Sequence, residues 1–269
     1  MGSVGKKAAV QEIRVESWAE LQDALWADAW QPGLARFRSD FAFRGRNDAG
    51  EQLVTSLQRL GGDVRALERH LLRNFRRYAP HEAALLDSPW NWLALGQHHG
   101  LPTRLLDFTH SPLVALHFVT SDLESFGRDG VVWMVDYVQA QQEAPEAQRA
   151  ELDEAAMNVF TAESLGRVAS GLRELEELGG EFVLFLEPPA LNERIVNQYA
   201  LFSLASRPDA RLDEWLEARP QLVRRVVVPA ELKWEVRDKL DQANVTERVL
   251  FPGLDGLSRW LKRYYLPRT

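Results

Sequence analysis

The sequence predicts a single α+β domain built on a mixed β-sheet, with helical elements at the N-terminus, within the chain and at the C-terminus. Short apolar, β-branched runs alternate with amphipathic stretches of helical period, which favours an α+β arrangement. No internal repeat or low-complexity linker divides the 269 residues, so one large core is expected. We therefore expect residues 1–14 to be a flexible N-terminus and residues 15–269 to form the domain.

Start and stop signals locate the elements of the first half. Ser17, with Glu20 three residues later, has the pattern of a capping box. Pro80 ends a long amphipathic stretch. Ser88 and Ser111 each precede a proline, which suits an N-cap followed by the first helical position. These signals predict a helix from residue 17, a strand over 41–43 that ends at Arg44, helices over 63–78 and 88–100, a strand over 104–108 and a helix from 111.

Apolar runs bounded by glycine or proline continue through the second half. Gly130 begins one such run, and Pro188 and Pro189 end another. Between them, residues 139–178 are rich in Ala and Glu, which predicts a helical insertion of two helices. The remaining expectations are strands from 130 and 181, a helix over 189–197, strands over 198–204 and 222–228, and closing helices over 230–244 and 253–265.

Composition limits the classes of function. The net charge of −7 argues against a generally basic protein that coats nucleic acid, and the absence of cysteine excludes a thiolate nucleophile and cysteine-ligated zinc. No apolar run approaches the roughly 20 residues that cross a bilayer. We therefore expect a cytoplasmic protein without a membrane partner. For the arginines of one predicted helix, a solvated face is favoured over a track for phosphates; these are Arg69, Arg73, Arg76 and Arg77.

The segment QHHGLPTRLLDFTHSPLVALHF, residues 97–118, places polar side chains in an otherwise apolar run. Such side chains must be paired in the interior or line a cleft, because burial without a partner is costly. Arg104 and Asp107 point to opposite faces of a strand, so one is expected at a cleft and the other at a structural partner. His98, at a helix end, is open to a role as a base, a diphosphate partner or a stacking surface. Ser111 fits an N-cap better than a catalytic role.

Several common kinds of site are absent from the sequence. There is no G-x-S-x-G elbow of a serine hydrolase, no P-loop and no G-x-G-x-x-G cradle. Adjacent His98 and His99 diverge by about 100° on a helix and make a poor metal pair with Asp107, so no metal is predicted.

Four blocks of the sequence resemble the FRG domain family, which is named for a Phe-Arg-Gly tripeptide. The tripeptide is Phe43-Arg44-Gly45 here, within FRGR at 43–46. The other three blocks are QHHGLPTRLLDFTHSPLVALHF at 97–118, ERIVNQYALF at 193–202 and LFPGLDGLSRWL at 250–261.

The order of motifs is also similar to that of ADP-ribosyltransferases, which have an arginine at the end of an early strand, a Ser-Thr-Ser-like strand that leads into a helix, and a late glutamate. The corresponding residues are Arg44, the segment 107–111 with the helix after it, and Gln198, which stands where a carboxylate is usual. The resemblance implies an ADP-ribosyltransferase-like core. It also implies NAD as a substrate held by Arg44, Arg104, Thr109 and Ser111, with catalytic roles for Arg44, His98, Asp107, Thr109 and Gln198.

The function implied by this resemblance is NAD use, either ADP-ribosyl transfer or NAD hydrolysis, by a bacterial toxin or phage-defence effector. Its partners would be a nucleotide substrate and a protein or nucleic-acid acceptor. One alternative is a binding module that holds a nucleotide, nucleic acid or protein in the same cleft without turnover, as the amide of Gln198 suggests. Another is an assembly protein in which the polar segment only supports the core.

Overall fold

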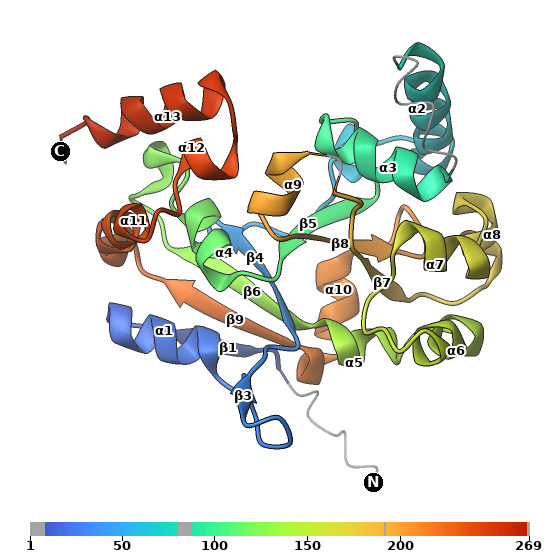
Figure 1. Cartoon of the computed structure of the whole chain (residues 1–269), viewed down its shortest axis with the longest axis horizontal. Helices are drawn as coiled ribbons and strands as arrows, with labels where there is room; N and C mark the ends of the chain where they lie inside the picture. The colour runs from blue at the N-terminus through green and yellow to red at the C-terminus, as the bar shows by residue number, and fades with distance from the viewer. Residues whose placement is uncertain (1–8, 80–87, 191, 268–269) are drawn as a thin grey trace, which may run out of the picture.

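A computed structural model describes residues 9–79, 88–190 and 192–267, and its main feature is a seven-stranded mixed sheet (Figure 1). The strand order is β1-β9-β6-β4-β5-β8-β7; β1 and β9 are parallel, and all other neighbours are antiparallel. The mixed α+β class predicted from the sequence is confirmed. The strands are β1 (Gln11–Arg14), β4 (Phe41–Arg46), β5 (Leu105–Thr109), β6 (Gly130–Asp136), β7 (Val183–Leu186), β8 (Ala200–Ala205) and β9 (Val223–Val228), with a separate pair, β2 (Trp30–Gln31) and β3 (Arg36–Phe37).

Helices surround this sheet, and none in the described part of the chain has the length and apolar character needed to cross a membrane. The α-helices are α1 (Trp18–Trp26), α2 (Val64–Tyr78), α3 (Pro89–His98), α4 (Pro112–Val119), α5 (Tyr137–Gln141), α6 (Glu146–Glu154), α7 (Ala162–Val168), α8 (Leu172–Glu177), α9 (Glu193–Asn197), α10 (Leu212–Glu217), α11 (Lys233–Gln242), α12 (Glu247–Leu250) and α13 (Leu254–Tyr264).

The helices form groups over different parts of the sheet (Figure 1). Helices α1, α4 and α11 pack on the β9-β6-β4 part, where Phe43, Met134 and Val226 are buried among their side chains. Helices α2, α3, α6, α7 and α8 form a second apolar cluster against β8 and β7 at the other end. Helices α5 and α10 contribute to a third cluster, which contains Ala42 and Phe108 and so lies on the opposite face of the sheet.

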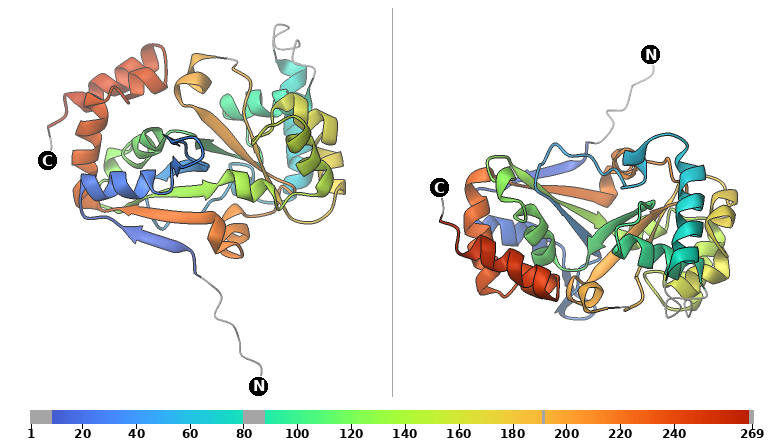
Figure 2. Two further views of the ribbon diagram at one scale, coloured as in Figure 1. Left: turned by 60° about the horizontal axis from the view of Figure 1, so that its bottom comes forward. Right: turned by 90° about the horizontal axis from the view of Figure 1, so that it is seen from above.

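The sheet opens between β4 and β5. The ladder between these two strands, both of which are fully described, consists of the single pair Phe43 and Thr109. By contrast, β4 pairs with β6 over all six of its residues, and β5 pairs with β8 over all five of its residues. The two parts of the sheet therefore diverge beyond one residue pair, and the views in Figure 2 show the strands spreading apart. This gap positions the candidate site.

Most of the predicted elements are present, and local capping explains several of their ends. The Ser17 side chain accepts a hydrogen bond from the Glu20 amide at the start of α1, and Ser88 and Ser111 cap α3 and α4 as expected. Helix α2 agrees with the predicted 63–78, with Asp63 as its N-cap. The predicted stop at Pro80 lies outside the described residues.

Several expectations differ from the structure. Residues 11–14, assigned to a flexible N-terminus, form β1, because they hydrogen-bond in parallel with β9. Two helices were expected over 139–178, but four short ones, α5 to α8, lie between Tyr137 and Glu177, and a capping box at Thr161 begins α7. Helix α9 begins at Glu193 instead of residue 189, after the N-cap Asn192, and β8 begins at Ala200, because Gln198 ends the helix and Tyr199 takes a left-handed φ of 47°. Helices α10 and α12 and the strands β2 and β3 were not predicted.

Candidate functional site

The Phe-Arg-Gly tripeptide lies in β4 beside the gap, and its residues serve different purposes. Phe43 is fully buried in the core beneath α4. Gly45, on the same face, lets α4 approach so closely that a Cβ at this position would lie 1.8 Å from the carbonyl oxygen of Ala115. Arg44 points to the other side of the strand, where its guanidinium donates a hydrogen bond across the gap to the main-chain oxygen of Asp107.

A cavity of about 230 Å³, which we call the central cavity, occupies the gap between β4 and β5. Four of the predicted site residues line it, namely Arg44, Asp107, Thr109 and Gln198. Its remaining lining residues are Phe43, Gly45, Arg46, Phe108, Phe118, Arg194 and Ala200. Residues far apart in the sequence are thus brought together by β4, β5 and α9.

The central cavity carries an excess of positive charge. Arg44, Arg46 and Arg194 line it together with one carboxylate, that of Asp107. Burial lowers the pKa of Arg44 and of Arg194 below the usual range of an arginine. Burial, followed by the positive charge of Arg44, lowers the pKa of Arg46 to about 10. All three guanidinium groups nevertheless remain charged at neutral pH.

Two of these arginines also have unsatisfied donors. The Nε atoms of Arg44 and Arg46 are buried and have no hydrogen-bond partner among the described residues. One terminal nitrogen of Arg46 pairs with Glu51. Buried N–H groups without partners are costly, and both of these arginines line the central cavity.

Thr109, Ser111 and Gln198 are tied into the framework of the cavity. The Thr109 hydroxyl donates to the main-chain oxygen of Gln198 at 2.7 Å and accepts from the Ser111 amide at 3.0 Å. The Ser111 hydroxyl caps α4 by accepting from the Val114 amide at 3.4 Å, and Ser111 does not line the cavity. The Gln198 amide nitrogen donates one hydrogen bond to the main-chain oxygen of Leu250 at 2.9 Å, and its Oε1 accepts none from the described residues.

His98 lies in a neighbouring cavity of about 470 Å³, which we call the side cavity. Arg194 lines both cavities, and Phe251 and Arg259 complete much of the side cavity. The nitrogen of Asn192 lies 2.6 Å from His98 Nε2, while the oxygen of Asn192 accepts from the Ile195 amide, so Asn192 is the donor to His98.

This contact determines the state of His98. Burial, followed by the charge of Arg194, lowers the pKa of His98, which favours the neutral ring. The lone pair on Nε2 already accepts a hydrogen bond from Asn192. His98 therefore supports the start of α9 beside the cavity, and its Nε2 is not available as a base in this structure.

Arg104, which the resemblance assigned to cofactor binding, does not line either cavity. Its side chain is 1% exposed and donates from Nε at 2.7 Å to Glu68, from one terminal nitrogen at 2.6 Å to Glu176, and from the other at 3.0 Å to the main-chain oxygen of Ser206. As expected, one of the two residues, Asp107, lines a cavity and the other, Arg104, is held by structural partners, although Arg104 lies just before β5 instead of within the strand. Asp107 also accepts a hydrogen bond from Gln97 at 3.0 Å.

Two arginines of the central cavity, Arg46 and Arg194, were not among the site residues predicted from the sequence. Arg194 lies in the ERIVNQYALF block only four residues before Gln198, and this closeness in the sequence is a signal that could have found it. Arg46 follows two residues after Arg44 in an alternating strand and therefore shares its face. No group of three or more His, Asp and Glu side chains suited to a metal ion occurs within residues 9–79, 88–190 and 192–267.

Comparison with known proteins gives one match. The family model of the FRG domain matches residues 39–127, which include the first two of the four resembling blocks. The blocks at 193–202 and 250–261 lie outside the match. No curated protein and no solved structure matches the chain. The matched segment supplies β4, β5 and α4, and with them Arg44, Asp107 and Thr109 of the central cavity. The chain therefore contains an FRG domain at residues 39–127.

Proposed function

We propose that the central cavity binds the diphosphate of NAD and that the protein breaks the bond between nicotinamide and ribose, by ADP-ribosyl transfer or by hydrolysis. The observation that carries the proposal is the convergence of Arg44, Asp107, Thr109 and Gln198 on one cavity. The similarity of their order in the sequence to that of ADP-ribosyltransferases supports the same function, as does the departure of β4 from β5, which makes room for a ligand.

The charges of the cavity suit the two parts of such a reaction differently. Arg44, Arg46 and Arg194 offer planar, charge-assisted donors for a diphosphate. Loss of nicotinamide leaves positive charge on the ribose, which a carboxylate stabilises and an amide does not. Asp107 is the one carboxylate among the residues that line the central cavity, so we assign it this role.

The remaining polar residues are assigned by their contacts. Gln198 Oε1 accepts a hydrogen bond from a ribose hydroxyl, because the amide nitrogen of the same side chain already donates to the main-chain oxygen of Leu250. Thr109 and Ser111 hold the loop between β5 and α4 and do not contact the ribose, because their hydroxyls are used within the framework. Arg194, at the boundary of the two cavities, directs the rest of the dinucleotide toward the side cavity.

The test is nicotinamide release from NAD by the purified chain, with and without extracts that supply protein and nucleic-acid acceptors. We expect release by the wild type, and a loss of about 100-fold or more in Asp107→Asn, because the carboxylate charge is removed while the shape is kept. Arg44→Ala should weaken NAD binding. Arg36→Ala, on the exposed β3 strand away from both cavities, is the control and should match the wild type. Absence of nicotinamide release under all conditions would contradict the enzymatic proposal.

A second candidate function is nucleotide binding without turnover, and the amide of Gln198 favours it. The variant Gln198→Glu separates the two candidates. If the site is catalytic, an added carboxylate should preserve or raise turnover, at the cost of the hydrogen bond to Leu250, about 1 kcal/mol of stability. If it is a binding module, calorimetry should detect NAD or ADP-ribose binding that Arg44→Ala abolishes, with no release of nicotinamide by either form.

We also propose the cytoplasm as the compartment and a toxin or phage-defence role for the enzyme. Induced expression in a bacterial host should then lower cellular NAD and arrest growth, and the Asp107→Asn variant should do neither. Growth arrest by both forms would indicate that the effect does not depend on NAD cleavage.

A further inference from the structure

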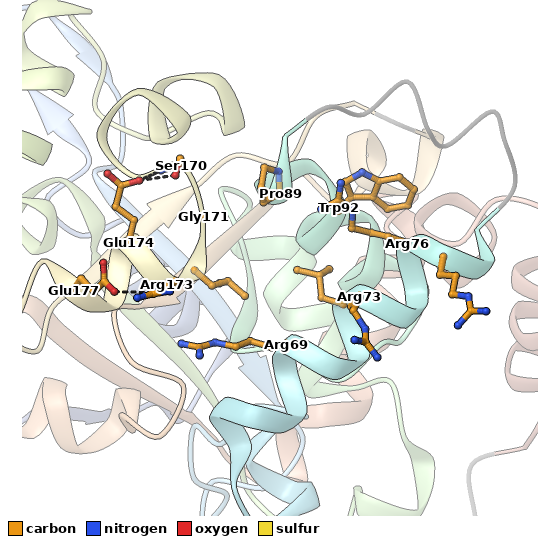
Figure 3. A pocket seen from close by; sticks show the side chains of 13 residues that line it. Arg69, Arg73, Arg76, Pro89, Trp92, Ser170, Gly171, Arg173, Glu174 and Glu177 are labelled. Carbon is orange, nitrogen blue, oxygen red and sulfur yellow. Dashed lines mark hydrogen bonds and ion pairs between the residues drawn. The ribbon is translucent and has the colours of Figure 1, made fainter.

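A groove of about 930 Å³, separate from the central and side cavities, lies between α2, α3 and α8; we call it the arginine groove (Figure 3). One wall is α2, from which Arg69, Arg73 and Arg76 project in Figure 3. Arg77 also belongs to this wall, and Pro89 and Trp92 of α3 form part of the lining. The opposite wall is the segment from Ser170 to Glu177.

The exposed side of α2 is strongly basic. Its 15 residues contain five arginines and one histidine, and the single acidic residue, Glu68, is 1% exposed and paired with Arg104. Arg69, Arg73 and Arg77 follow one another at four-residue intervals, about 6 Å apart along the helix axis. This regular row of cations contrasts with the net charge of −7 of the whole chain.

The acidic residues of the opposite wall are already engaged. Glu174 accepts hydrogen bonds from the amide and hydroxyl of Ser170, at 2.7 and 2.6 Å, and Glu177 pairs with Arg173 at 2.7 Å, as the dashed lines in Figure 3 mark. Across the groove, Arg69 shares Glu176 with Arg65 and Arg104. Within the described residues, Arg73, Arg76 and Arg77 form no ion pair.

We propose that the arginine groove binds the phosphodiester backbone of a nucleic acid. Arginine presents a planar fork that matches phosphate, and evenly spaced cations on one helix suit evenly spaced anions on a linear polymer. A concave surface is poorly matched to a flat membrane. An acidic peptide carries charge without a fixed repeat, so it is less well matched to the row on α2. Arg76, whose guanidinium lies 5.6 Å from the Trp92 ring centroid, is held in place by this contact.

The proposal does not depend on the proposed function, because none of its residues lines the central cavity. Helix α3 nevertheless connects the two places: Trp92 lines the groove and His98, at the end of the helix, lines the side cavity. They are six residues apart, about 9 Å along the helix. Helix α3 thus takes part in both the arginine groove and the side cavity.

The test is fluorescence anisotropy with labelled single-stranded DNA, duplex DNA and RNA of about 20 nucleotides, over a range of salt concentrations. We expect binding to at least one of them. For three to four phosphate contacts, log K should fall against log salt with a slope of about −2 to −3 on a single strand. The double variant Arg73→Ala with Arg77→Ala should bind a single strand at least tenfold more weakly. Its salt dependence should also be shallower, with the magnitude of the slope smaller by about 1.4.

The matched control is Arg36→Ala with Arg38→Ala, which removes the same charge from an exposed segment around β3, far from α2 in Figure 1. It should bind within twofold of the wild type, and so should Arg44→Ala, which separates this proposal from the NAD proposal. If the double variant has a lower melting temperature, Arg73→Gln alone repeats the test. No binding at about 50 mM salt, equal losses in variant and control, or binding of polyglutamate or anionic vesicles in place of nucleic acid would overturn the proposal.

Discussion

Replacement of Gly45 by alanine should be one of the most destabilising small substitutions in the chain. The added Cβ would lie 1.8 Å from the Ala115 oxygen and 2.8 Å from its carbonyl carbon, both of which are main-chain atoms of α4. To reach the 3.4 Å of an ordinary contact, the helix must move by about 1.6 Å. That movement would separate α4 from Phe43 and the core beneath it.

Overpacking a rigid core site costs about 1–3 kcal/mol, and contact with main chain places Gly45→Ala at the upper end or above it. A cost of about 3 kcal/mol corresponds to a fall in melting temperature of roughly 6–12 °C for a chain of this size. The assay is thermal and urea unfolding followed by circular dichroism. The control is Gly127→Ala, where the new Cβ meets no atom within 4 Å, and which should stay within about 0.5 kcal/mol of the wild type. A melting temperature of Gly45→Ala within 2 °C of the wild type would refute the close-packing explanation of the tripeptide glycine.

Three further predictions concern stability. Burial lowers the pKa of His117 to about 3, below its unfolded value of about 6.5, so stability is full above pH 6.5 and falls as the pH drops toward 3. Urea unfolding should give a loss of about 2 kcal/mol between pH 7.5 and pH 5 that is missing in His117→Gln; equal losses would contradict it. Arg104→Ala should cost about 3–5 kcal/mol by leaving Glu68 buried without its partner, with unchanged NAD affinity in the fraction that folds, measured by calorimetry. Ser111→Ala should cost about 1 kcal/mol through the lost cap of α4 and leave nicotinamide release unaltered; a loss of release greater than tenfold would instead support a direct role.

The parts of the fold that the sequence could predict depend on neighbouring residues. Ser17, Asp63, Ser88 and Ser111 cap helices through contacts within three residues, and these helices begin as expected. The apolar run from Gly130 is buried along its whole length, as a continuous apolar strand should be. Local capping and local hydrophobicity were therefore sufficient for these elements.

The parts that could not be predicted depend on contacts between distant residues. Residues 11–14 look polar and unstructured alone, and they form a strand only because β9, more than 200 residues later, offers an edge. Arg104 fitted a ligand-binding role by its type, but Glu68 and Glu176, 36 and 72 residues away, occupy its donors. The order of motifs in the sequence predicted a shared site for Arg44, Asp107, Thr109 and Gln198. The four residues line one cavity only because β4 separates from β5 in the folded sheet.

The single residue pair that joins β4 to β5 has a consequence for how mutational data on this site should be interpreted. Past Phe43 and Thr109, the strand edges that border the gap present main-chain N–H and C=O groups that no ladder satisfies. A ligand bound in the gap would meet these groups as well as the arginines, apart from the main-chain oxygen of Asp107, which already accepts a hydrogen bond from Arg44. Side-chain substitution cannot remove them, so any affinity that survives in Arg44→Ala would combine the contribution of the backbone with that of Arg46, Arg194 and Gln198.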